Sequence, residues 1–281
     1  MANSKINQSE LSYSCSVGEA KVNLFTGRLL FNHPDISIGI GSYQIIISHI
    51  YNSELALPTG INTIFGQKWK LNIEQYVYKE YDPNTEKDIY IDTLGYKHEF
   101  HELDYGEPVK TKFYDTSGLG LTLTVNLGNI VITDEANNKM VFENSRLIKT
   151  VSTENEKMIK YFDHDSSGRL ISVYDGRKSD NNLSFSYDPS TNLLNRITCK
   201  KGSKVIEEID YYYDSRKCID KITRTVDGIT KIDSLFSYYG VSLAYAVGYE
   251  DNSAIRFNYL NSKVSMVATG VATLTPQSKI E

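Results

Sequence analysis

HDSSGRLISV at residues 164–173 is followed by two segments of the same pattern, YDPSTNLLNRI at 187–197 and YDSRKCIDKI at 213–222. Each segment begins with a ring and an acid, passes through polar residues, and ends on two branched apolar residues three positions apart. The three starts lie 23 and 26 residues apart. YLNSKVSMV at 259–267 is a degenerate copy, and FENSRLIKTV at 142–151 is an earlier echo. Such self-similarity is typical of proteins that stack one small unit many times.

The chemistry of one unit predicts a β-hairpin. The aromatic residue ends a strand with its ring on the core face, and the acid that follows accepts hydrogen bonds from backbone N–H groups in a tight turn. Leu or Ile then opens the return strand. A single hairpin cannot bury its apolar side, so neighbouring hairpins are expected to share one curved face. The residues that define the repeat are Asp165, Gly168, Arg169, Leu170, Tyr187, Asp188, Tyr213, Asp214 and Tyr259.

The rest of the chain also indicates strands. Residues 22–30 and 36–51 alternate apolar and polar positions with Gly, Asn and Asp between them, and we find no amphipathic helix of three turns. The 21 tyrosines among 281 residues favour pleated surfaces. We predict an all-β fold of antiparallel hairpin repeats stacked into a curved or spiralling sheet. Its expected parts are a polar tail (1–20), an N-terminal β region (21–140), a repeat region (141–267) and a C-terminal tail (268–281).

Charge and composition exclude several classes of protein. The net charge of −5 and the absence of a basic cluster argue against nucleic-acid binding. The polar N-terminus lacks a signal peptide, and no apolar stretch is long enough to span a bilayer. Cys15, Cys199 and Cys218 match no zinc motif, and we expect free thiols, with a Cys199–Cys218 disulfide as the alternative if both lie on neighbouring strands.

The repeats resemble the YD repeats of RHS (rearrangement hot spot) proteins, in which Tyr-Asp is followed by Gly-Arg-Leu. Gly168, Arg169 and Leu170 match that pattern, and the Tyr-Asp pairs at 187 and 213 supply the name-giving residues. The sequence departs from the pattern at His164, which replaces Tyr, and the later copies lack Gly-Arg.

The first half resembles the segment that opens an RHS shell. Its similar motifs are VNLFTGRL (22–29), HIYNS (49–53), FGQKWKL (65–71) and GYKHEF (95–100), with Lys68 in place of a second Gly. The family residues carried over are Thr26, Gly27, Tyr51, Asn52, Phe65, Gly66 and Trp69.

The resemblance implies a wall of a hollow β cocoon that encloses a toxic polypeptide. It implies as partners a cargo toxin or a further RHS-repeat chain, with self-association through exposed sheet edges as an alternative. It also implies a secreted or cell-surface location, reached by a route that the sequence does not reveal. The closing Arg-Tyr-Tyr-Asp-Pro motif and a following toxin domain are absent, so we expect the opening portion of a shell.

Candidate catalytic residues have simpler interpretations. In HEFHE (98–102), a strand would turn His98 and His101 to opposite faces, which disfavours a shared metal. The acid pairs Asp163/Asp165 and Asp233/Glu250 fit turn-forming roles. Motifs for a serine hydrolase, a zinc protease or a phosphate loop are missing. We predict no cofactor, no metal and no enzymatic activity.

The predicted function is therefore a non-catalytic scaffold, part of an RHS-type shell that encloses, carries or presents a toxin or effector. The alternative is a carbohydrate-binding cell-surface module that uses exposed rings for stacking. A polysaccharide hydrolase is a third hypothesis, for which the sequence offers no pair of carboxylates across a cleft.

Overall fold

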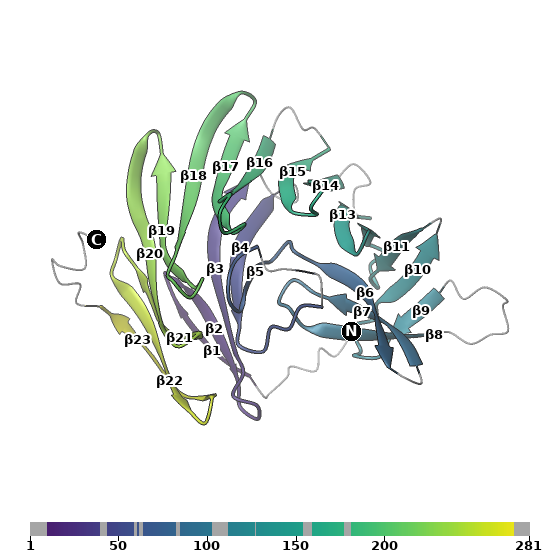
Figure 1. The fold of residues 1–281 in the computed structure, drawn as a ribbon, viewed down its shortest axis with the longest axis horizontal. Helices are drawn as coiled ribbons and strands as arrows, with labels where there is room; N and C mark the ends of the chain where they lie inside the picture. The colour runs from purple at the N-terminus through teal and green to yellow at the C-terminus, as the bar shows by residue number, and fades with distance from the viewer. Residues whose placement is uncertain are drawn as a thin grey trace.

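The computed structural model describes residues 10–39, 44–58, 61, 64–82, 85–102, 112–126, 128–153, 159–176 and 181–272, and its regular elements are all strands (Figure 1). Every strand pairing is antiparallel. The prediction of an all-β, antiparallel fold is confirmed. The described segments include no helix with the length and hydropathy that crossing a bilayer would require.

The N-terminal sheet contains five strands that pair in chain order. They are β1 (Glu10–Cys15), β2 (Gly18–Asn23), β3 (Leu29–Ile38), β4 (Ile45–Asn52) and β5 (Trp69–Leu71). In β3 a bulge falls between Pro34 and Ile36, so Asp35 is an extra residue without a partner in β4. A bulge re-aims the side chains around it, and here both Asp35 and Ile36 are buried.

The barrel consists of eight strands that also pair in chain order. They are β6 (Tyr76–Asp82), β7 (Thr85–Ile91), β8 (Lys97–Glu102), β9 (Lys112–Asp115), β10 (Thr122–Asn126), β11 (Asn129–Thr133), β12 (Lys139–Glu143) and β13 (Arg146–Val151). The ring closes where Arg146 of β13 pairs with Tyr76 of β6. Two backbone hydrogen bonds flank this pair, from Val77 N to Ser145 O (3.1 Å) and from Leu147 N to Gln75 O (3.4 Å).

The repeat sheet continues from β13 without a break. Its strands are β14 (Ile159–His164), β15 (Leu170–Asp175), β16 (Asn181–Tyr187), β17 (Leu194–Lys201), β18 (Lys204–Tyr213), β19 (Ile219–Val226), β20 (Ile229–Tyr239), β21 (Ser242–Gly248), β22 (Ser253–Leu260) and β23 (Lys263–Val271). Each strand pairs with its neighbour in the chain, so every hairpin adds to the edge left by the one before.

The N-terminal sheet lies between the repeat sheet and the barrel (Figure 1). Phe31 and Trp69 pack against Phe236 of the repeat sheet, with ring centroids 6.3 and 5.5 Å apart. On the barrel side, the buried ammonium of Lys70 donates hydrogen bonds to the carbonyls of Asp92 (3.1 Å) and Thr93 (2.9 Å). One apolar core runs through all three parts.

The structure corrects three details of the sequence-based division. The predicted curved sheet does not account for strands β6–β13, which close into a barrel where β13 pairs with β6. The boundary at residue 140 falls inside β12. Residues 10–20 and 268–271, assigned to tails, form strands instead.

Candidate functional site

The repeat acids close the hairpin turns of the repeat sheet. Asp165 Oδ1 accepts hydrogen bonds from the backbone N–H groups of Ser167 and Arg169, both at 2.9 Å. Asp188 Oδ1 accepts from Ser190 and Thr191, and Asp214 Oδ1 accepts from Arg216 and Cys218, at 2.8–3.0 Å. Hydrogen bonds to the charged form, led by the Ser190 hydroxyl, lower the pKa of Asp188 to about 2. These carboxylates are therefore occupied within their own turns.

The hydroxyls of four tyrosines link each hairpin to the one before it. The acceptor is a backbone carbonyl at the start of the preceding return strand, at 2.6–2.7 Å in each case. The pairs are Tyr187 to Leu170, Tyr213 to Leu194, Tyr238 to Ile219 and Tyr259 to Leu243. We call Tyr187, Tyr213, Tyr238 and Tyr259 the tyrosine spine. Its regularity fixes the offset between neighbouring hairpins.

A β-bulge precedes every aromatic residue of the spine. The register shifts fall between Ser186 and Tyr187, Tyr212 and Tyr213, Ser237 and Tyr238, and Asn258 and Tyr259. The same shift precedes His164 and Phe142. Because a bulge re-aims the side chain beside it, it directs each ring toward the previous hairpin. Sequence analysis missed Tyr238, which no Asp follows; its spacing of 25 residues from Tyr213 was the available signal.

Two arginines join successive turns. Arg169 Nε donates to Asp165 Oδ2 (2.8 Å), and its guanidinium lies 4.8 Å from the ring centroid of Tyr187. Arg216 makes the same bond to Asp214 (2.8 Å) and lies 5.9 Å from the Tyr238 ring. Each guanidinium therefore binds its own turn and covers the next spine ring, a cation–π arrangement.

The predicted family residues of the first half contact the repeat sheet directly. The Tyr51 hydroxyl donates to Val241 O (3.3 Å) and accepts from Leu243 N (3.2 Å). Trp69 Nε1 donates to the hydroxyl of Tyr238 at 3.0 Å. The ring of Phe65 lies 4.7 Å from that of Tyr211.

Two glycines allow close backbone contacts with the same sheet. Gly66 has φ +85°, and a Cβ there would lie 2.2 Å from the carbonyl oxygen of Lys217. Gly27 has φ +71° and packs against Lys263, while its carbonyl accepts from Val264 N at 3.1 Å. Thr26 stays in its own turn, where Oγ1 accepts from Arg28 N (3.1 Å).

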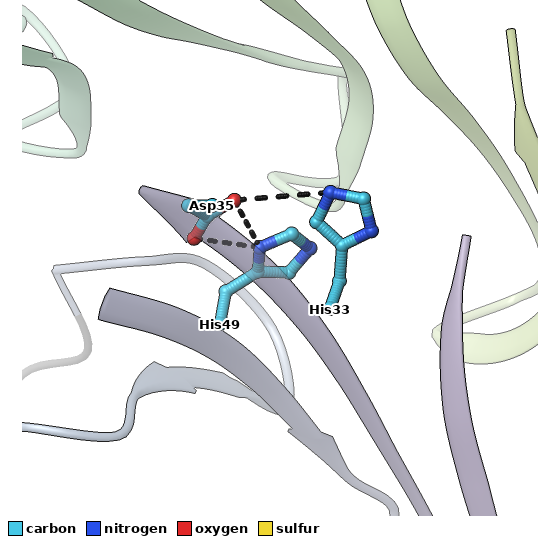
Figure 2. Close-up of side chains that lie close together, drawn as sticks. All are labelled: His33, Asp35 and His49. Carbon is cyan, nitrogen blue, oxygen red and sulfur yellow. Dashed lines mark hydrogen bonds and ion pairs between the residues drawn. The ribbon is translucent and has the colours of Figure 1, made fainter. Parts of the chain in front are cut away.

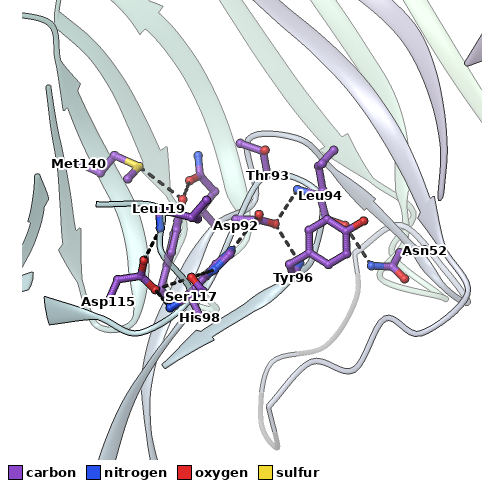
Figure 3. A network of polar contacts seen from close by, with 12 residues as sticks. Asn52, Asp92, Thr93, Leu94, Tyr96, His98, Asp115, Ser117, Leu119 and Met140 are labelled. Atoms are coloured by element: carbon purple, nitrogen blue, oxygen red, sulfur yellow. Dashed lines mark hydrogen bonds and ion pairs between the residues drawn. The ribbon is translucent and has the colours of Figure 1, made fainter. Parts of the chain in front are cut away.

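Asn52 and His98 belong to a polar network on the barrel side (Figure 3). Asn52 Nδ2 donates to Leu94 O (3.1 Å). The buried His98 contacts Asp92 Oδ2 through Nε2 (3.0 Å) and Ser117 Oγ through Nδ1 (2.9 Å), so it connects two turns of the barrel. His101 on the same strand is exposed, which separates the two imidazoles.

A second buried polar cluster was missed by sequence analysis: His33, Asp35 and His49 (Figure 2). His33 and His49 are register partners on β3 and β4, and the bulge brings in the Asp35 carboxylate. Burial opposes charging of His33, but the hydrogen bond to Asp233 and the charge of Asp35 outweigh it and raise its pKa. Burial lowers the pKa of His49 despite Asp35. Asp233, interpreted from sequence as a turn residue, lies within β20 and contacts this cluster.

A cavity of about 590 Å³ lies where the barrel meets the first repeats. Its lining includes Glu74, Tyr76, Arg146, His164 and Arg169. Glu74 is the one acidic residue among the described lining residues, and it is bound to Leu71 N (2.7 Å) and the Tyr76 hydroxyl (2.9 Å). The described lining therefore lacks the two opposed carboxylates that glycoside hydrolysis requires.

The three cysteines are free thiols. Cys199 lies on β17 and Cys218 immediately before β19, and β18 separates these strands. Burial raises the pKa of both thiols to about 11, so both are protonated near neutral pH.

Comparisons with known proteins do not assign this chain to a family. No protein-family model and no curated protein matches the chain. Among solved structures, a porin-like protein from Bacteroides uniformis is similar over 70% of this chain and 94% of that one. The identity is 13% and the TM-score 0.26, a likeness that carries no argument about fold or function.

Proposed function

We propose that this chain is a non-catalytic scaffold, a segment of a YD-repeat shell that encloses, carries or presents another polypeptide. The observation that supports the proposal best is the tyrosine spine, because it is a means of adding hairpins at a constant offset. A second support is the packing of the N-terminal sheet and the segment before β5 on the repeat sheet. Tyr51, Gly66 and Trp69 contact successive repeats there.

The repeat sheet ends at β23 with the features expected of a continuing wall. Within the described residues β23 pairs with β22 alone. Val264 pairs with Tyr259 as Leu243 pairs with Tyr238, so its carbonyl is equivalent to the acceptors of the spine. No described tyrosine hydroxyl reaches it. Met266 and Val271 on this strand are exposed. We infer that a further hairpin, from a following segment or a partner chain, pairs here.

The test is the oligomeric state of this chain, alone and co-expressed with proteins encoded beside it, measured by size exclusion with light scattering. We expect a stoichiometric complex that Met266→Lys with Val271→Lys disrupts. The matched control is Val226→Lys with Ile229→Lys, which charges two exposed apolar residues away from the sheet edge. A monomer that captures nothing, or equal capture by both double variants, contradicts the proposal.

Carbohydrate binding remains the alternative, and the structure narrows where it could occur. The four spine tyrosines are partly buried against the core, with their hydroxyls bound to backbone carbonyls, so they offer little ring surface for stacking. Among the described residues the exposed tyrosines are Tyr81, Tyr114, Tyr212 and Tyr239, on four different strands. A glycan array that gives a signal abolished by Tyr212→Ala and Tyr239→Ala would favour this function over the scaffold.

A further inference from the structure

The cluster of His33, Asp35 and His49 combines burial with an unusual density of ligating atoms (Figure 2). All three side chains are almost fully buried, and one ligand atom from each lies within 4.8 Å of the other two. His49 Nδ1 lies 2.8 Å from Asp35 Oδ1, which lies 4.0 Å from His33 Nε2. Asp233 Oδ2 approaches His33 Nε2 to 3.0 Å from the repeat sheet.

The hydrogen bonds of this cluster do not balance with neutral imidazoles. His33 Nδ1 faces the carbonyl of Val17, and its Nε2 faces the carboxylate of Asp233. Both partners are acceptors, whereas a neutral imidazole has a single N–H. His49 directs Nδ1 at Asp35, while its Nε2 is buried and makes no hydrogen bond within the described chain, and a ligand bond at Nδ1 does not change that.

From this geometry we infer a structural site for a divalent transition metal such as Zn²⁺, held by His33 Nε2, His49 Nδ1 and Asp35, with Asp233 beside it. Two imidazoles and one carboxylate are a ligand set that Zn²⁺ accepts, and tetrahedral geometry leaves a fourth position open. Ligand bonds of about 2.0–2.2 Å place neighbouring ligand atoms roughly 3.3 Å apart. The three ligand atoms lie within 4.8 Å of one another, with 2.8 Å from His49 Nδ1 to Asp35 Oδ1 and 4.0 Å from Asp35 Oδ1 to His33 Nε2.

The groups around the site match what metal ligands need. The Val17 carbonyl holds His33 in the tautomer whose Nε2 lone pair points into the cluster, a common arrangement around bound zinc. Arg224 Nε donates to Asp233 Oδ1 (2.9 Å), which leaves Oδ2 directed at His33. The aromatic rings of Phe65, Trp69 and Phe236 surround His49 and exclude water.

Charge also balances when a dication is present. Asp35 and Asp233 together carry two negative charges, which Zn²⁺ neutralises with both histidines neutral. Arg224 forms an ion pair with Glu207 beside the site and contacts the Asp35 carbonyl at 2.6 Å. A buried, uncompensated charge is costly.

The role that follows is to fasten the N-terminal sheet to the repeat sheet. The three ligands come from β3 and β4, and Asp233, whose carboxylate lies 3.0 Å from His33 Nε2, comes from β20, far along the chain. Because the site is enclosed, the ion enters during folding, when metal binding and folding are coupled. The inference does not depend on the proposed scaffold function.

The experiment refolds the full chain from guanidinium with either Zn²⁺ or EDTA, removes free metal by gel filtration and measures bound zinc by mass spectrometry. We expect about one Zn²⁺ per chain and a higher unfolding midpoint than in EDTA. His33→Gln and His49→Gln should each reduce bound zinc at least about tenfold. The matched control is His101→Gln, which changes an exposed histidine and should retain the metal.

Two results overturn the inference. One is folded wild-type protein without zinc above the buffer level, which would leave a hydrogen-bonded imidazolium cluster. The other is zinc retained by both histidine variants. If a variant does not refold, Co²⁺-refolded wild-type protein decides, because a four-coordinate site gives intense visible absorption and its absence excludes the site.

Discussion

The repeat sheet and the barrel build their turns in the same way but join their hairpins differently. In the barrel Asp92, Asp115 and Asp134 each accept backbone N–H groups from the residues that follow, at 2.8–2.9 Å. Asp165, Asp188 and Asp214 do the same in the repeat sheet. The acidic turn therefore makes a hairpin in both regions and does not by itself distinguish them.

The difference lies in the tyrosine hydroxyls. In the repeat sheet they bind carbonyls of the preceding hairpin. In the described barrel the hydroxyls of Tyr76, Tyr90 and Tyr96 bind side chains instead: Glu74, Gln75 and Glu10. The barrel closes where β13 meets β6. We infer that the spine keeps the repeat sheet open and extendable, whereas its absence permits closure.

Of the substitutions that test this comparison, Trp69→Ala has the largest expected effect on stability. Trp69 is fully buried between the N-terminal sheet and the repeat sheet and binds the spine residue Tyr238. We expect a loss of about 3–5 kcal/mol in the free energy of unfolding. Hydrogen exchange should accelerate in the repeat sheet more than in the barrel. Phe142→Ala, in the buried lining of the barrel, should show the reverse distribution. Equal acceleration in both regions for both variants would mean that they are one unit.

Gly66→Ala should cost about 2–3 kcal/mol, because the residue has φ +85° and its new Cβ would collide with the Lys217 carbonyl. The matched control is Gly118→Ala in the barrel, where φ is +81° but no atom lies within 4 Å of the added Cβ. It should cost about 1 kcal/mol. Chemical denaturation measures both. Equal losses would show that backbone conformation, and not contact with the repeats, determines the effect.

Tyr213→Phe removes a single hydroxyl oxygen and so tests whether the spine hydrogen bonds stabilise the repeat sheet. Removing the hydroxyl leaves the Leu194 carbonyl without its donor, and we expect a loss of about 1–2 kcal/mol. Tyr114→Phe on β9 removes a half-exposed hydroxyl from the barrel and should change stability by less than about 0.5 kcal/mol. If Tyr213→Phe is as neutral as Tyr114→Phe, the spine hydroxyls do not stabilise the stack.

Sequence patterns predicted what local chemistry determines. The Asp turns at 165, 188 and 214 depend on atoms within four residues, so composition and spacing reveal them. Closure of the barrel depends on Tyr76 meeting Arg146, and no local signal marks either residue. The sequence pattern did not identify Tyr238 as a spine residue, because its turn contains Gly240 and no acid follows the tyrosine.

The histidine cluster was hidden for a different reason. His33 and Asp35 have the two-residue spacing that places side chains on one face of a strand, which was a usable signal. The partner His49 becomes visible only when β3 and β4 are set in register, and the contribution of Asp233 requires the repeat sheet to fold over the N-terminal sheet. Such contacts are non-local and cannot be derived from spacing.

His164→Tyr has the smallest expected effect, and it is the substitution that we expect to raise the free energy of unfolding. His164 follows a bulge and pairs with Leu170, as spine tyrosines pair with the residues that open their return strands, and it borders a cavity with room for a larger ring. By the spacing of Tyr187 to Leu170, a tyrosine here would donate to the Leu147 carbonyl. We expect a gain of about 0.5–1.5 kcal/mol at neutral pH, measured by denaturation.

The pH dependence of the same pair sharpens that test. Burial, with a smaller contribution from Arg146, lowers the pKa of His164 to about 4, below its ordinary value of 6.5. Between these values the unfolded chain binds the proton and the folded chain does not, so His164 makes stability fall as the pH drops from 6.5 to 4. Tyrosine does not titrate in this window, and the advantage of His164→Tyr should therefore widen on acidification. A gap that narrows on acidification would contradict the role of His164 in the pH dependence. A variant less stable than the wild type at pH 7.5 would show that the spine does not extend to β14.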